Sequence, residues 1–405
     1  MNGWIMKNKI LASLAVGLFG VAGLEAQNIQ SVPEADNVFG FRLLQELAKE
    51  QPDKNLFISA YSAATVLQMV ANGAAGTTRT EMQSALATSA LTPAKVNTGN
   101  QTILHTLKNF DSRTTLTTAN AIWYRQGFTV KPDFLKVNQD FFSATVAPLD
   151  FASPHAPEVI NTWVSDQTHG KIQKLADGMI DPKMTALFLV NAVYFKAKWE
   201  DPFKPEATRD QPFHPHPDQS VTVPMMSKTG SFTYRRGTGY QAVRLPYQDE
   251  RLAMYVFLPD TNSSPETLLT QLNGDTWQRV TRPGFAEKEG ALKLPRFKME
   301  YDVDLIPALQ AFGMKKAFDS VQADFSGIAP QLYISGVRQK TFVEVKEEGT
   351  EAAAATAVGV RAAGLPMPPK DRFLMIVDRP FLFLIEEQQT GTILFAGMVH
   401  NPTEP

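Results

Sequence analysis

The chain has 405 residues, 43% of them hydrophobic, and its 39 basic and 41 acidic side chains give a formal net charge of -2. This is enough apolar material for one large domain or two ordinary ones, and the nearly neutral charge gives no reason to expect nucleic acid or an anionic membrane as a partner. The chain contains no cysteine, so disulfides, a thiolate nucleophile and a cysteine-based metal site are excluded.

Residues 1–26 have the layout of a secretory signal peptide. Lys7 and Lys9 precede an apolar run over residues 10–24, and Ala26 offers a small residue for cleavage. The run is too short and too rich in small residues for a membrane span, and no other stretch of the sequence qualifies as one. We therefore expect a secreted protein, extracellular or periplasmic, from which this segment has been removed.

The spacing of apolar residues along the chain indicates a mixture of helices and strands. Helical spacing occurs over residues 36–49, 63–71, 77–86, 130–142, the start of 159–176, and 305–318. Candidate strands begin at residue 55 and cover residues 116–124, 186–199, 221–226, 231–234, 240–245, 252–258, 292–297, 332–345, 379–385 and 394–397. The run 186–199 is apolar almost throughout, which is typical of a strand buried on both faces.

Motifs for catalysis or cofactor binding are weak in this sequence. Residues 237–242 formally resemble a dinucleotide-binding fingerprint, but strands flank them on both sides, so they predict a hairpin turn. His214 and His216 lie in a proline-rich stretch with no third ligand nearby. No metalloprotease, nucleophile-elbow or phosphate-loop motif occurs. We expect a protein that is not an enzyme and that holds no cofactor and no metal ion.

Residues 343–358 admit two interpretations. On local rules Gly349 stops a strand, Thr350 caps a helix, and the following alanines propagate it as a surface helix or a flexible linker. In an extended conformation the segment instead has one face without charge or bulk, formed by Thr350, Ala352, Ala354, Thr356 and Val358. Such a strand can enter a crowded sheet interior because no large or charged side chain has to be buried.

The sequence Glu-Glu-Gly-Thr-Glu-Ala-Ala-Ala-Ala-Thr at residues 347–356 resembles the hinge of inhibitory serpins almost residue for residue, and further similarity runs from about Asp36 to Pro402. The resemblance implies an α+β serpin fold, with a large central mixed β-sheet, smaller β-sheets, surrounding helices and an exposed reactive loop at about residues 347–372. We expect one such domain over residues 27–405, in a secreted bacterial protein that is a monomer.

The resemblance also implies roles for individual residues. The hinge comprises Glu347, Glu348, Gly349, Thr350, Glu351, Ala352, Ala353, Ala354, Ala355 and Thr356. Residues of the family's breach, where the loop enters, and of its shutter, beneath the sheet, are matched by Trp199, Arg296, Ser59, Ser62, Asn191 and Gln339. Glu347 is expected to pair with Arg296 near Trp199. Gln339 replaces the family's usual histidine and can still donate and accept a hydrogen bond.

The activity that the resemblance implies is suicide inhibition of a serine peptidase, with the cleaved loop inserted as a new sheet strand. Family spacing places the scissile bond between Ala363 and Gly364, and the prolines that follow leave bonds after residues 361–364 open to attack. Alanine before the cut favours an elastase-like or subtilisin-like target, whereas cleavage of the bond between Arg361 and Ala362 keeps a trypsin-like target open.

Two other functions are weighed against inhibition. A non-inhibitory serpin that acts as a binding or chaperone-like protein is expected to carry bulky, charged or proline residues in the hinge, and the four consecutive alanines at 352–355 argue against it. A hydrolase would need a catalytic triad assembled from distant residues, and no motif in the sequence indicates one.

Overall fold

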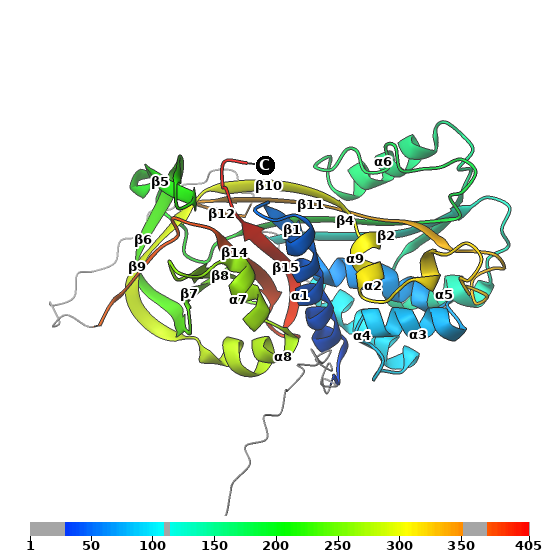
Figure 1. Cartoon of the computed structure of the whole chain (residues 1–405), viewed down its shortest axis with the longest axis horizontal. Coiled ribbons are helices and arrows are strands. Elements are labelled where there is room, and N and C mark those ends of the chain that lie inside the picture. The colour runs from blue at the N-terminus through cyan, green and yellow to red at the C-terminus, as the bar shows by residue number, and fades with distance from the viewer. Residues whose placement is uncertain (1–28, 109–113, 351–370, 405) are drawn as a thin grey trace, which may run out of the picture.

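The computed structural model describes residues 29–108, 114–350 and 371–404. Two β-sheets organise these residues, and helices cover both faces of one of them (Figure 1). The six-stranded sheet consists, in spatial order, of β10 (Phe297–Asp304), β11 (Ile334–Lys346), β12 (Gly349–Thr350), β4 (Leu187–Lys198), β2 (Thr114–Arg125) and β3 (Thr145–Leu149). This large mixed β-sheet, surrounded by helices and accompanied by a second sheet, is the α+β architecture expected from the sequence.

The second sheet curves away from the first. Its main path runs through β1 (Leu56–Ile58), β15 (Thr392–Val399), β14 (Phe381–Glu387), β8 (Leu252–Pro259), β7 (Tyr240–Pro246), β6 (Gln219–Gly237), β9 (Ala286–Pro295) and β13 (Phe373–Ile376), with β5 (Arg209–His216) paired to β6. The helices are α1 (Val32–Glu50), α2 (Ala60–Ala71), α3 (Gly76–Ala85), α4 (Pro93–Lys108), α5 (Pro132–Phe142), α6 (Ala156–Gln167), α7 (Pro265–Gln271), α8 (Gly274–Thr276) and α9 (Ile306–Ala311).

Strand β4 is central because both of its faces are covered. Its residues from Leu187 to Phe195 are all buried, as the apolar run in the sequence predicts. On one face α6 packs over a small apolar cluster, and on the other face lie α2 and the main core (Figure 1). No described helix is both long and apolar enough to span a membrane.

Two predicted elements differ from the structure. The strands expected at 221–226 and 231–234 are one continuous strand, β6, because its pairing with β9 runs through Gly230 opposite Gly290. The helix expected at 305–318 ends with α9, because the chain reverses at Gly313 with φ of +90°, and a short 3-10 turn follows at Lys316–Phe318. The hairpin predicted at 237–242 is confirmed by the pairing of Gly237 with Tyr240.

Candidate functional site

The start of the predicted hinge already forms part of the six-stranded sheet. Strand β11 ends at Lys346, the chain turns, and β12 lies antiparallel between β11 and β4 (Figure 1). In this register Gly349 lies opposite Lys198 and Thr350 lies opposite Ala197. Below β12, strands β4 and β11 pair with each other directly and in parallel. We call the contact line between β4 and β11 the seam. The two strands are separated by β12 at one end of the seam and are paired directly along the rest of it.

Gly349 suits its position because a larger residue could not occupy it. Its φ is +152°, a conformation that L side chains rarely adopt, and a Cβ atom built there would lie 2.1 Å from the carbonyl oxygen of Ala197. Glycine thus lets the chain enter the narrow space beside β4.

Thr350 points into the core, as the two-residue periodicity predicts. It is fully buried, and its hydroxyl lies 2.8 Å from that of Tyr247. The Tyr247 ring stacks on Trp199 with ring centroids 4.5 Å apart. Trp199 in turn donates from Nε1 to the Lys346 carbonyl and from its backbone N–H to the Glu348 carbonyl, both at 2.9 Å. These contacts fix both ends of the turn between β11 and β12.

Glu347, within that turn, forms the expected ion pair with Arg296. The Arg296 Nε lies 2.9 Å from each carboxylate oxygen, and its Nη2 lies 2.7 Å from Oε1. The Thr208 hydroxyl also donates to this carboxylate, and the Phe203 N–H donates to the Glu347 carbonyl at 2.9 Å. Burial acts to raise the pKa of Glu347, but the hydrogen bonds from Arg296 and Thr208 outweigh it and lower this pKa.

Beneath the sheet, Gln339 joins the predicted shutter residues. Its Nε2 donates to the Ser59 carbonyl at 3.0 Å and to Asn191 Oδ1 at 2.7 Å, and its Oε1 accepts from the Ser59 N–H at 3.0 Å. Asn191 donates to the Ser62 hydroxyl and to Asn120 Oδ1. Gln339 and Asn191 are cross-strand partners on β11 and β4, so this network lies on the directly paired part of the seam.

Part of the predicted site lies outside the described residues. This applies to residues 1–26 and to the hinge from residue 351 onward, namely Glu351, Ala352, Ala353, Ala354, Ala355 and Thr356. It applies equally to the candidate reactive bonds, which involve Arg361, Ala362, Ala363 and Gly364.

The structure adds residues that sequence reasoning missed. Tyr247 supports Trp199 and Thr350, Thr208 supports Glu347, and Asn120 extends the network at Asn191. Asn120 lies on β2, Thr208 directly precedes β5, and Tyr247 directly follows β7. Nothing in the local sequence of these residues marks them. Their contacts depend on the register between distant strands, which no local pattern specifies.

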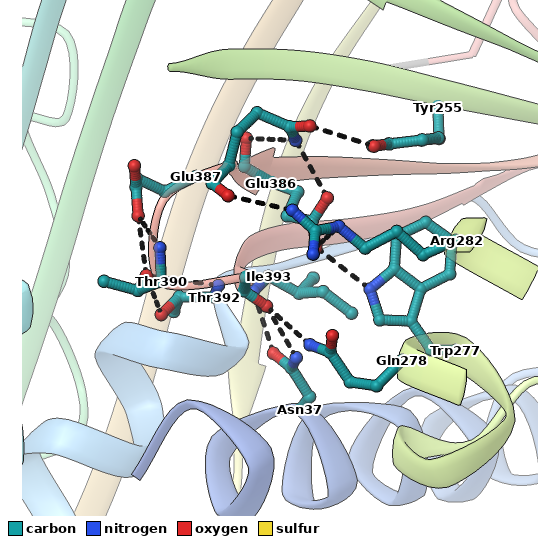
Figure 2. Close-up of polar contacts among 12 residues, drawn as sticks. Asn37, Tyr255, Trp277, Gln278, Arg282, Glu386, Glu387, Thr390, Thr392 and Ile393 are labelled. Carbon is teal, nitrogen blue, oxygen red and sulfur yellow. Dashed lines mark hydrogen bonds and ion pairs between the residues drawn. The ribbon is translucent and has the colours of Figure 1, made fainter. Parts of the chain in front are cut away.

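A second cluster of buried carboxylates lies at the end of β14, where the chain turns toward β15 (Figure 2). Glu386 is fully buried and accepts from Trp277 Nε1 at 3.1 Å and from Gln388 Nε2 at 2.8 Å, with Arg282 Nε 3.2 Å away. Burial outweighs these contacts and raises the pKa of Glu386.

The neighbouring Glu387 closes the same turn. It accepts from the N–H groups of Gln389 and Thr390 at 2.9 and 2.8 Å, and from the Thr390 hydroxyl at 2.6 Å. Asn37 of α1 fastens the turn to the core through Gly391 and Ile393 (Figure 2). Within the described ranges no three His, Cys, Asp or Glu residues are grouped to hold a metal ion. Because its polar groups are committed to one another, this cluster has a structural role.

Comparisons with known proteins agree with this geometry. A family model described as "Serpin (serine protease inhibitor)" matches residues 34–402. An uncharacterized serpin-like protein from Thermococcus kodakarensis is 36% identical over 92% of this chain and 86% of its own length. The leukocyte elastase inhibitor of Bos taurus is 36% identical over 92% of this chain and 100% of its own length. The crystal structure of the thermophilic serpin tengpin in its native state superposes with a TM-score of 0.84 at 29% identity, covering 93% of this chain and 95% of tengpin.

Proposed function

The chain belongs to the serpin family, and from this premise we propose that it inhibits serine peptidases as a suicide substrate. The nucleophile of the target attacks the loop that follows β12 and forms an acyl-enzyme. The cleaved loop then enters the six-stranded sheet as a new strand between β11 and β4, as serpin loops do. The target supplies the chemistry, and the inhibitor supplies the conformational change that interrupts it.

The observation that carries this proposal is the position of β12. Its two residues already occupy the place where an inserting strand begins, with β11 on one side and β4 on the other. Thr350 is buried there without disturbing either neighbour. This supports insertion of the rest of the hinge, whose face formed by Ala352, Ala354, Thr356 and Val358 carries no charge and no bulky group.

The register of β12 indicates how insertion continues. Counting on from Thr350 opposite Ala197 and Val345, Thr356 comes to lie opposite both Asn191 and Gln339. These two residues are now bonded directly to each other. We infer that insertion replaces this bond, with the Thr356 hydroxyl as the new hydrogen-bonding partner between the two side chains. The same count places Ala352 and Ala354 toward the core.

The same register limits where the target can cut. A strand that pairs with all of β4 must extend to Val360, which would lie opposite Leu187 at the start of β4. The candidate bonds after residues 361–364 all lie beyond this point. We propose cleavage between Ala363 and Gly364 by an elastase-like or subtilisin-like peptidase, and the printed name of one relative, an elastase inhibitor, supports a target with a small specificity pocket. Cleavage between Arg361 and Ala362 by a trypsin-like peptidase is the second candidate.

We further propose that residues 1–26 direct export in a bacterial host and that residues 27–405 form the mature, monomeric domain. The basic residues followed by an apolar run and Ala26 support export, and the absence of cysteine means that folding outside the cytoplasm needs no disulfide formation. N-terminal sequencing of the exported protein tests this: a mature chain that begins at Gln27 is expected, and retention of the apolar run contradicts it.

The test of inhibition is to incubate the protein with elastase, subtilisin and trypsin and to look for a complex that survives SDS. The proposal predicts a covalent complex with at least one of them. It also predicts a released C-terminal fragment, whose mass should identify Gly364 as its first residue. Cleavage of the loop without a complex would support a non-inhibitory serpin that acts as a binding or chaperone-like protein. Turnover of a peptide substrate by the protein itself would support the hydrolase alternative.

A further inference from the structure

A cavity lies beside the hinge, between the segment 199–203 and strands β6, β7 and β9. Its volume is about 430 Å³, which is within the range of small-molecule sites. Trp199, Phe203, Lys228, Arg244 and Glu287 are among the residues that line it. Neither the proposed inhibition nor the sheet opening uses this cavity.

Some charged side chains around the cavity have a partner of opposite charge, and others do not. Lys228 is paired with Asp201, with Nζ 2.8 Å from Oδ2. Glu287 accepts hydrogen bonds from the hydroxyls of Ser231 and Thr233 at 2.7 and 2.8 Å. Both of its partners are neutral, so among the described residues Glu287 has no cation to pair with.

Arg244 is the complementary case. Within the part of the chain that the structure describes, its guanidinium forms no hydrogen bond or ion pair, although it lines the same cavity. The two unpaired charges lie in one row across the sheet, because Thr233 is the cross-strand partner of both Arg244 and Glu287. Two strand spacings separate the backbones of Arg244 and Glu287, which is about 10 Å. With backbones this far apart on one face of the sheet, both side chains can contact a small polar ligand that lies between them in the cavity.

We propose that this cavity binds a free amino acid through its zwitterionic end, with the carboxylate on Arg244 and the ammonium on Glu287. A guanidinium binds a carboxylate through two parallel hydrogen bonds, and a carboxylate that already accepts from two hydroxyls retains lone pairs for an ammonium group. A simple anion fits less well, because it would satisfy Arg244 alone and would lie beside Glu287 and the exposed Glu200. The same negative charges disfavour an acidic ligand side chain, and Lys228 and Arg244 in the lining disfavour a basic one, so the proposed ligand is an amino acid with a neutral side chain.

Binding at this cavity has a route to the hinge. The backbone of the segment 199–203 donates from Trp199 to the Glu348 carbonyl and from Phe203 to the Glu347 carbonyl, both at 2.9 Å. The other side of this segment bonds to the end of β7 through the N–H of Glu200. A ligand that orders this segment therefore stabilises the turn that leads into β12.

Isothermal titration calorimetry with glycine, alanine, leucine and phenylalanine tests the proposal on the full-length protein. We expect at least one of these to bind with a Kd below about 1 mM. Its amide, which lacks the carboxylate, and its N-acetyl form, which lacks the ammonium, should each bind at least about tenfold more weakly, a difference of about 1.4 kcal/mol. Because these analogues need no mutation, they decide the question even if a variant misfolds.

Variants then assign the two ends of the ligand. Arg244→Gln and Glu287→Gln should each weaken binding at least about tenfold. Arg236→Gln is the matched control, because Arg236 is an exposed arginine on β6 that pairs with Asp260 outside the cavity, and it should bind as the wild type does. The proposal is overturned if no amino acid gives a saturable signal up to 10 mM, if the analogues bind as well as the parent, or if succinate or phosphate binds more tightly.

Discussion

Two buried glutamates in this molecule, Glu347 at the hinge and Glu386 in the β14–β15 turn, are each held by an arginine, but their surroundings differ. Glu347 lies in a two-residue turn at the end of the sheet, and its partner Arg296 has a side chain that is 40% exposed. Glu386 lies between α1, the segment 277–282 and two strands, and its remaining partners are buried or half-buried side chains (Figure 2). Both arginines are partly exposed, Arg296 at 40% and Arg282 at 31%, so the difference lies in the contacts of the carboxylates: Arg296 approaches Glu347 with two nitrogens, whereas Arg282 Nε lies 3.2 Å from a fully buried Glu386.

The pKa values of the two carboxylates shift in opposite directions because their surroundings differ. The pKa of Glu347 is lowered, because a bidentate arginine and a hydroxyl offset its burial, whereas the pKa of Glu386 is raised because burial outweighs its partners. A polar cluster at the edge of solvent can break and re-form at small cost, which suits a segment that changes place. A cluster in the interior is expensive to break, which suits a segment that stays. In the proposed mechanism, the hinge is therefore the part of the sheet system that changes, and the β14–β15 turn is the part that persists.

The largest effect is expected from Glu386→Ala. The change leaves Arg282, Trp277 and Gln388 without their shared acceptor inside the protein, and should reduce the free energy of unfolding by about 3 to 5 kcal/mol. Urea denaturation followed by fluorescence measures this. Glu300→Ala is the control, because Glu300 pairs with Lys340 on the surface and should cost less than about 1 kcal/mol. Equal losses in the two variants would remove the distinction between persistent and changing clusters.

The next effect belongs to the inserting strand itself. In the register of β12, Ala354 would lie opposite Val193 and Thr341, both buried. Ala354→Arg should leave the native fold intact but oppose insertion by several kcal/mol, because an unpaired guanidinium would enter the core. The stoichiometry of inhibition should rise at least about tenfold, because hydrolysis of the acyl-enzyme then outpaces insertion, and each factor of ten needs only about 1.4 kcal/mol.

Ala353→Arg is the matched control for this prediction, because residue 353 would face outward in the same register. We expect it to retain most of its inhibition. If both variants inhibit as the wild type does, the two-residue periodicity of the hinge is wrong.

A third carboxylate, Asp36 on α1, sharpens the comparison because no cation is paired with it among the described residues. It is fully buried, and Oδ1 accepts from Gln68 Nε2 at 2.7 Å while Oδ2 has no partner. Burial raises its pKa to about 8 from 3.8. The native state therefore keeps the proton that the unfolded state loses, so stability from this group is complete below about pH 4 and declines as pH rises toward 8.

Asp36→Asn removes this dependence. Relative to the variant, the wild type should lose about 2 to 3 kcal/mol of stability between pH 5 and pH 7, at about 1.4 kcal/mol per pH unit. Denaturation curves of both proteins at the two pH values measure this. Parallel changes in the two proteins would show that Asp36 is ionised in the folded state.

The smallest effect is expected from Glu347→Ala. Loss of the pair with Arg296 should cost less than about 1 kcal/mol of stability but should accelerate loop insertion and polymerisation on mild heating. Because the pKa of Glu347 is lowered, the pair contributes above the ordinary pKa of 4.5 and is lost as pH falls through the folded value, so acid should accelerate the wild type toward the variant. Glu344→Ala, which breaks the more exposed pair with Lys346, is the control. Equal polymerisation rates for wild type and Glu347→Ala would contradict a restraining role.

The sequence predicted most of the regular elements, because their periodicity is local. The apolar run of β4 and the hairpin at Gly237 follow directly from such patterns. The helix expected at 305–318 failed because the signal of Gly313 was overridden by the apolar residues on both sides of it. The strand β6 appeared as two strands because Gly230 interrupts its pattern, although pairing with β9 continues through that residue.

The candidate site was less accessible to local reasoning. Only the family resemblance placed Glu347 beside Arg296, since 51 residues separate them. The contact of Tyr247 with Thr350 depends on where two strands from different sheets meet, and 103 residues separate the two partners. The position of Asp36 did carry a signal, because Asp36, Phe39 and Leu43 share one helical face, so an apolar stripe surrounds this carboxyl. The unpaired charges of Arg244 and Glu287 had no signal of this kind.

In mechanical terms, the six-stranded sheet resembles a plate with a short crack, because β12 separates β11 from β4 at one end of their contact. The described part of β12 reaches Thr350, and direct pairing of β11 with β4 begins where Phe342 lies opposite Tyr194. A crack that already exists needs no initiation, because the entropy of bringing the hinge to the seam has been lost in the native state. If the proposed insertion continues from this point, its rate depends first on the contacts between β4 and β11 next to Thr350, and less on the total strength of the pairing between these two strands.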